Sequence, residues 1–127
     1  MSITVRNFFY LLFGDHDREE FEYRLGEHLS YVESETRLLD RRTAAYMVYV
    51  YVAEVLHEAD EPSIEPAFVL KDIYECSACI KYIAEVYLKG IMTAKDCVFG
   101  GREKVEEDDA AVIVRRVFDR SKRFGSV

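Results

Sequence analysis

The sequence predicts an all-α protein, a small bundle of about five helices formed by a single helical domain over residues 1–127. The first observation is a long apolar stretch without Gly or Pro between Asp40 and Ala59. The second is that apolar residues recur at helical spacing in the segments before and after it. The third is that Gly14, Gly90 and both prolines separate these segments, as helix-ending residues do.

The N-terminal part, residues 1–39, is predicted to be a helical pair. A short apolar helix over Ile3 to Phe13 is stopped by Gly14, and a second runs from Arg18 to about Glu33. One face of the second helix carries Phe21, Leu25, His28, Leu29 and Val32. The run from Phe8 to Phe13 is more apolar than a short exposed helix normally is. We expect it to cap the bundle, and the alternative is a homodimer interface.

Residues 40–59 are predicted to form the central helix. The alternation Val48-Tyr49-Val50-Tyr51-Val52 would also suit a buried strand, but strands rarely run as long as the stretch that contains it. Asp40 is a good N-cap. The apolar run is shorter than the roughly 20 residues that span a bilayer. We therefore expect a buried helix with Val48, Val52 and Leu56 in the core.

The rest of the chain is predicted to alternate links and helices. Residues 60–71 form a partly extended linker that contains Pro62 and Pro66, with Phe68, Val69 and Leu70 held against the core. A fourth helix follows over 72–89, and a last helix over about 106–120. Residues 121–127 are predicted to fray.

Composition argues against several classes of function. The net charge of −7 disfavours direct binding to nucleic acid. Neither a signal peptide nor a membrane span is evident, and three cysteines suit a reducing cytosol, so a cytoplasmic location without membrane contact is predicted. No catalytic or phosphate-binding motif is present, which predicts a non-enzymatic protein without a cofactor.

Cys76-Ser77-Ala78-Cys79 is a CxxC motif at the start of the fourth predicted helix. A helix N-terminus lowers a thiol pKa, so redox chemistry is one interpretation. A metal site would need paired ligands elsewhere, and neither Cys97 nor the histidines show that spacing. The favoured interpretation is two small, buried, apolar side chains.

The acidic run before the last helix is the candidate partner-binding site. Its residues are Glu103, Glu106, Glu107, Asp108 and Asp109. They could contact a basic protein surface, and the plainer alternative is a solvated helix start that satisfies the helix dipole. A basic cluster near the C-terminus could contact phosphate, but the favoured interpretation is a solvated helix end; its residues are Arg115, Arg116, Arg120, Lys122 and Arg123.

Residues 70–120 resemble a bacterial S-layer homology (SLH) repeat. The shared features are an Asp-Ile opening at 72–73, a helix closing on Gly-Ile-Met at 90–92, a loop ending in Phe-Gly at 99–100, and then a second helix. Residues 40–45, Asp-Arg-Arg-Thr-Ala-Ala, stand where another repeat would have Thr-Arg-Ala-Glu-Ala-Ala. The resemblance covers about one and a half repeats, a type of unit that packs into bundles.

The resemblance implies attachment to a pyruvylated secondary cell-wall polysaccharide, with the motif arginine facing the anionic sugar. That position is Arg41 in the first repeat, which makes Arg41 the candidate sugar-binding residue, and Glu107 in the second, where the charge is reversed. The reversal favours a protein partner. The sequence therefore predicts a bacterial or phage protein-binding module. The alternatives are wall-polysaccharide binding and an acidic nucleic-acid mimic that inhibits a defence nuclease, as anti-CRISPR proteins do.

Overall fold

The computed structural model describes residues 1–14 and 37–124, and within these ranges it is all-α, as predicted. Four α-helices are present there: α1 (Val5–Phe13), α4 (Arg41–Val50), α5 (Ile80–Leu88) and α6 (Glu107–Phe118). The described residues contain isolated backbone bridges but no strand. The helix predicted from Arg18 to Glu33 lies outside the described residues, so the total of about five helices stays a prediction.

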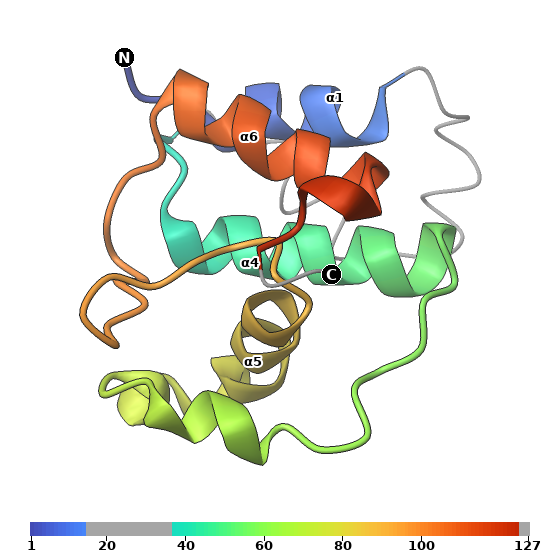
Figure 1. Ribbon diagram of the computed structural model, residues 1–127. Helices are drawn as coiled ribbons and strands as arrows, with labels where there is room; N and C mark the ends of the chain where they lie inside the picture. Colours follow the sequence, from blue (N-terminus) through green and yellow to red (C-terminus); the bar gives the residue numbers. More distant parts are fainter. Residues whose placement is uncertain (15–36, 125–127) are drawn as a thin grey trace.

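Helix α4 lies at the centre, between α1 and α6 on one side and α5 on the other (Figure 1). The core is continuous across all four helices. Phe8, Phe9, Leu12 and Phe13 of α1 are buried in it, while Tyr10 and Leu11 are exposed. The apolar face of α1 is thus covered within the chain, as the capping interpretation expects.

Three of the helices begin in the same way. The residue before each helix, Thr4, Asp40 or Glu106, has an extended backbone. The Thr4 side chain accepts a hydrogen bond from Asn7 N, and that of Asp40 accepts one from Thr43 N. These caps satisfy N–H groups that a helix start leaves without partners.

A closed ring of backbone hydrogen bonds joins these three helix starts. Ile3 N donates to Val105 O (3.0 Å), Val105 N to Leu39 O (2.9 Å), and Leu39 N to Ile3 O (2.8 Å). All three side chains are buried. The ring pairs polar backbone groups that the surrounding apolar side chains would otherwise leave without partners.

A second ring joins the first residue of each helix to a neighbouring segment. Its bonds run from Val5 N to Arg37 O (3.0 Å), from Arg41 N to Glu103 O (2.9 Å) and from Glu107 N to Met1 O (2.9 Å). Helices α1, α4 and α6 therefore start in an approximately threefold arrangement. Val5, Arg41 and Glu107 occupy equivalent positions in it.

The central helix changes its geometry before it ends. After α4 the chain continues as a π-helix, η1 (Tyr51–Val55), in which Leu56 N bonds to Tyr51 O. Val48 and Val52 are buried as predicted, but Leu56 is 37% exposed. The prediction for Leu56 was wrong because it assumed an unbroken α-helix, and the π-turn rotates the residues that follow it away from the core face.

The link between α4 and α5 differs from the predicted one. It contains a short 3-10 helix, η2 (Glu65–Val69). Leu70 is buried as expected, but Phe68 and Val69 are 41% and 56% exposed. The placement of these two against the core was wrong, because the turn of η2 directs them away from the buried Ala67 and Leu70.

The helix predicted over 72–89 is broken over its first eight residues, 72–79. Two single turns, η3 (Ile73–Glu75) and η4 (Ser77–Cys79), precede α5, and Cys76 between them is extended. The Asp72 side chain accepts hydrogen bonds from Phe99 N and Gly100 N, both at 2.9 Å, instead of capping a helix. A long-range contact therefore replaces the local helix start.

The C-terminal segment is packed rather than frayed up to Phe124. Helix α6 buries Ala110, Ile113 and Val117, whereas Phe118 is 53% exposed. A single turn, η5 (Arg120–Lys122), follows it. Phe124 N then donates to Gly90 O at 2.8 Å, so this segment lies directly on the turn that ends α5.

Candidate functional site

The five predicted acidic residues are all exposed, but they do not form one uniform patch. Glu107, Asp108 and Asp109 occupy the first turn of α6, where the helix dipole favours negative charge. Glu107 and Asp108 form no ion pair with any residue of the described ranges 1–14 and 37–124. Both carboxylates are exposed, and both act electrostatically on the Met1 amine.

Glu106 differs from its neighbours because it is used within the chain. One carboxylate oxygen lies 2.8 Å from the Met1 amine, and the other accepts a hydrogen bond from Ser2 Oγ at 3.0 Å. These hydrogen bonds hold the pKa of Glu106 below its usual range. Glu106 thus fastens the N-terminal segment to α6.

Glu103 and Asp109 both lie near Arg41, the candidate sugar-binding residue. Each lines a different groove that Arg41 also lines, and both carboxylates act on its guanidinium electrostatically. The acidic run therefore contains three residues that interact with Arg41 or with the N-terminal segment, namely Glu103, Glu106 and Asp109. Glu107 and Asp108 remain as the acidic contact surface.

Arg41 is held by backbone carbonyl groups. Its Nε donates to Phe99 O at 2.9 Å, its Nη2 donates to Thr93 O, and its Cζ atom lies 4.8 Å from the centre of the Phe99 ring. Burial lowers the pKa of Arg41, opposed by Glu103, Asp109 and Asp72 in that order. The Nη1 group has no hydrogen-bond partner among the described residues.

Two grooves meet at Arg41 and Thr93. The larger, of about 280 Å³, is lined also by Lys95, Asp96, Phe99 and Glu103, and the smaller, of about 180 Å³, by Met92, Asp109 and Arg116. Both mix acidic, basic and hydroxyl groups. Such a lining offers hydrogen bonds to a polar ligand but gives a polyanion less attraction than a purely basic groove would.

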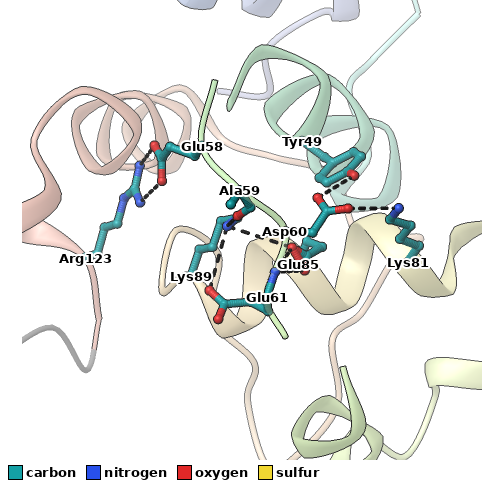
Figure 2. A network of polar contacts seen from close by, with 9 residues as sticks. All are labelled: Tyr49, Glu58, Ala59, Asp60, Glu61, Lys81, Glu85, Lys89 and Arg123. Carbon is teal, nitrogen blue, oxygen red and sulfur yellow. Dashed lines mark hydrogen bonds and ion pairs between the residues drawn. The ribbon is translucent and has the colours of Figure 1, made fainter. Parts of the chain in front are cut away.

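A buried polar network between α5 and residues 58–61 was not predicted (Figure 2). Glu85 is fully buried, and its two oxygens accept from Glu61 N at 2.8 and 3.0 Å. Lys89 Nζ donates to Ala59 O at 2.7 Å and lies 3.7 Å from Glu61 and 3.8 Å from Glu85. A sequence signal existed, since Glu85 and Lys89 are four residues apart on one helix.

Asp60 ties the same segment to α4 and α5. Its carboxylate accepts a hydrogen bond from Tyr49 Oη at 2.8 Å and pairs with Lys81 Nζ at 3.0 Å (Figure 2). The bond with Lys81, followed by the one with Tyr49, holds the pKa of Asp60 below its usual range. The pair is exposed, so it contributes little to stability.

The expectation of a solvated basic cluster was wrong for Arg123, which is buried in an ion pair with Glu58. Its Nη1 and Nη2 donate to the two oxygens of Glu58, both at 2.7 Å, and its Nε donates to Arg116 O at 2.8 Å. The Arg123 side chain is 4% exposed. A surface cavity of about 480 Å³ lies beside this pair, with Lys89 and Arg120 also in its wall.

The expectation that Cys76 and Cys79 are simply two buried apolar side chains was also wrong. Cys76 and Cys79 form a disulfide, and Cys97 is a free, exposed thiol. Cys79 is buried as predicted, but Cys76 is only partly buried. Among the described residues, no group of three or more His, Cys, Asp or Glu side chains is placed to hold a metal ion.

Comparisons of the chain with protein-family models, with curated proteins and with solved structures found no match. In the part of the chain that the structure describes, no helix has both the length and the apolar character needed to cross a membrane.

Proposed function

We propose that the chain is a non-enzymatic protein-binding module that contacts a basic protein surface through Glu107 and Asp108. The observation that carries this proposal is that both carboxylates are exposed at the start of α6 and form no ion pair within the described residues. Two exposed charges in the first turn of a helix are more precisely placed than charges on a loop. Glu106, which is bonded to Ser2 and the Met1 amine, is not part of this surface.

Electrostatic complementarity supports a basic partner. The net charge of −7 repels polyanions in general and attracts a positive surface. Charges at the rim of an interface act mainly on the association rate and on the choice of partner. We therefore expect the partner to associate more slowly as salt is added.

The proposal includes an SLH-like architecture in a cytoplasmic protein of bacterial or phage origin. It is supported by the equivalent starts of α1, α4 and α6 around one ring of backbone hydrogen bonds, because repeats bury their faces on one another. The Asp-Ile and Phe-Gly motifs also meet, since Asp72 accepts hydrogen bonds from Phe99 N and Gly100 N.

Affinity capture from a lysate of the native host, with quantitative mass spectrometry, tests the protein-binding proposal. The test variant is Glu107→Gln with Asp108→Asn, which removes two charges and keeps the side-chain shapes. The matched control is Glu65→Gln with Glu75→Gln, which removes two exposed charges on other elements. We expect a partner that is lost from the test variant and retained by the control. Equal capture by both variants would contradict the proposed surface, and a captured nuclease would favour nucleic-acid mimicry.

Wall-polysaccharide binding is the second candidate, favoured by the groove that Arg41 and Phe99 line together, in which Nη1 of Arg41 has no hydrogen-bond partner among the described residues. Against it stand the carboxylates of Glu103 and Asp109 beside Arg41. The two equivalent helix starts also carry no basic residue at this position.

Sedimentation with purified cell-wall sacculi separates the two candidates. We expect the protein to stay in the supernatant. Sedimentation that is abolished by Arg41→Ala and unaffected by Arg102→Ala, an exposed control arginine, would establish the wall-binding alternative instead.

A further inference from the structure

We propose that Cys76 and Cys79 form a reversible thiol–disulfide exchange site that accepts electrons from a dithiol reductant. This inference rests on the cytoplasmic location included in the proposed function, because disulfides that form in a reducing cytosol are usually transient and catalytic or redox-sensing. A disulfide in such a compartment therefore needs an explanation other than a rigid staple. The proposal is independent of the acidic surface and of Arg41.

The two sulfur atoms differ in how easily a reductant reaches them. Cys76 is partly exposed in the extended residue between η3 and η4, whereas Cys79 is 3% exposed. Thiol–disulfide exchange requires an incoming thiolate to reach one sulfur directly. The attack is therefore directed at Cys76 Sγ, and Cys79 is the leaving group.

The position of Cys79 favours its departure as a thiolate. Cys79 is the N-cap of α5, a helix of nine residues whose first turn contains no acidic side chain. The positive end of a helix dipole stabilises a thiolate and lowers the pKa of a thiol. A leaving group of lower pKa departs faster.

The exchange balances in two steps. In the first, a thiolate of the reductant bonds to Cys76 Sγ, the Cys76–Cys79 bond breaks, and Cys79 leaves as a thiolate. In the second, the other thiol of the reductant loses its proton and attacks its own bound sulfur, so Cys76 leaves as a thiolate. The reductant ends as an intramolecular disulfide, and the chain carries two thiols or thiolates after proton exchange with water.

The fold is expected to survive this reduction. The bond joins residues only three positions apart, so it closes a very short loop. Loop closure contributes least to stability for short loops. The segment has other anchors, since Leu70 and Ile73 are buried before it and Ile83 is buried after it.

Reduction of the intact folded protein tests the proposal. The full chain is treated with dithiothreitol, alkylated and analysed by mass spectrometry, with far-UV circular dichroism recorded in parallel; Cys97, exposed and free, reports complete alkylation. We expect both cysteines to become alkylated with the helical signal retained, and oxidised glutathione to restore the bond. A bond that opens only in urea, or helices that are lost on reduction, would overturn the proposal.

Single-cysteine variants test which of the two sulfur atoms is more accessible. In a Cys97→Ser background, Cys79→Ser leaves Cys76 as the sole thiol, and Cys76→Ser leaves Cys79. We expect Cys76 to react with a small aromatic disulfide at least about ten times faster than Cys79, because access limits exchange. Equal rates, or faster reaction at Cys79, would contradict the greater accessibility of Cys76 on which its assignment as the attacked sulfur rests.

Discussion

Replacing Arg123 by Met is predicted to destabilise the protein far more than other changes in the C-terminal segment. Arg123 makes two hydrogen bonds of 2.7 Å to Glu58 and one each to Arg116 O and Val117 O. Met fills a similar volume, so the change removes charge and hydrogen bonds with little loss of packing. It leaves Glu58, 13% exposed, as an unpaired carboxylate.

The size of the effect follows from this burial. Removing one partner of a fully buried ion pair costs about 3–5 kcal/mol, because the other charge stays desolvated. Water reaches part of Glu58, so we expect a loss of about 2–4 kcal/mol in the free energy of unfolding. The companion variant Glu58→Gln leaves the more buried Arg123 charge without its counter-charge, although the hydrogen bonds of Arg123 to Arg116 O and Val117 O remain, so it should also cost about 2–4 kcal/mol.

Urea unfolding followed by far-UV circular dichroism measures this loss as a lower midpoint with an unchanged slope. Lys122→Met, a change at an exposed position of η5, is the matched control and should shift the free energy by less than about 0.5 kcal/mol. A double-mutant cycle with Glu58→Gln should show coupling of at least about 1 kcal/mol. If Arg123→Met and Lys122→Met behaved alike, the buried ion pair would not hold the C-terminal segment.

Three further predictions concern the Glu58–Arg123 pair, the Gly90 turn and the π-helical end of the central helix. The hydrogen bond with Arg123 holds the pKa of Glu58 below its ordinary value of 4.5. The Glu58 carboxylate therefore contributes fully to stability above that pH, and this contribution is lost as the pH falls through the lower folded-state pKa. The urea midpoint measured at decreasing pH should show this loss in the unchanged chain and not in Glu58→Gln. Gly90→Ala should destabilise by roughly 1–2 kcal/mol or more, since Gly90 has a φ of 73° and its Cβ would lie 2.1 Å from Phe124 O; unchanged stability would contradict the docking of Phe124 there. Val48→Ala should cost about 2 kcal/mol and Leu56→Ala less than about 1 kcal/mol. Thermal unfolding of both variants measures this difference, and an equal or larger loss for Leu56→Ala would contradict the π-turn.

The sequence predicted helix ends correctly where they depend on residues close by in the chain. Helix α1 ends at Gly14, which has a φ of 56°, and α4 begins after its cap at Asp40. Both follow from short-range chemistry that a sequence displays directly. The acidic first turn of α6 was predicted for the same reason.

Long-range contacts account for most of what the sequence did not reveal. Asp72 bonds to Phe99 N and Gly100 N, which are distant in the chain, and the helix expected at 72–79 gives way to two single turns. The burial of Arg123 depends on Glu58, 65 residues away. No hydrophobic period indicates such pairs, because charged residues are normally exposed.

The acidic run was chosen as the candidate site from the sequence, and the contacts in the structure narrow it to two residues. The sequence identified the acidic run but not its division, because pairing depends on the Met1 amine, Ser2 and Arg41. Pairing with a distant segment cannot be deduced from a run of like charges. Glu107 and Asp108 therefore remain as the surface to test.

Association kinetics with the captured partner test the central claim most directly. The association rate is measured by biolayer interferometry at low and at physiological salt, for the unchanged chain and for Glu107→Gln with Asp108→Asn. We predict a rate that falls with salt, because screening limits the field to about 8 Å at physiological ionic strength, and a slower, less salt-sensitive rate for the variant. An association rate that neither salt nor the variant changes would contradict binding through the start of α6.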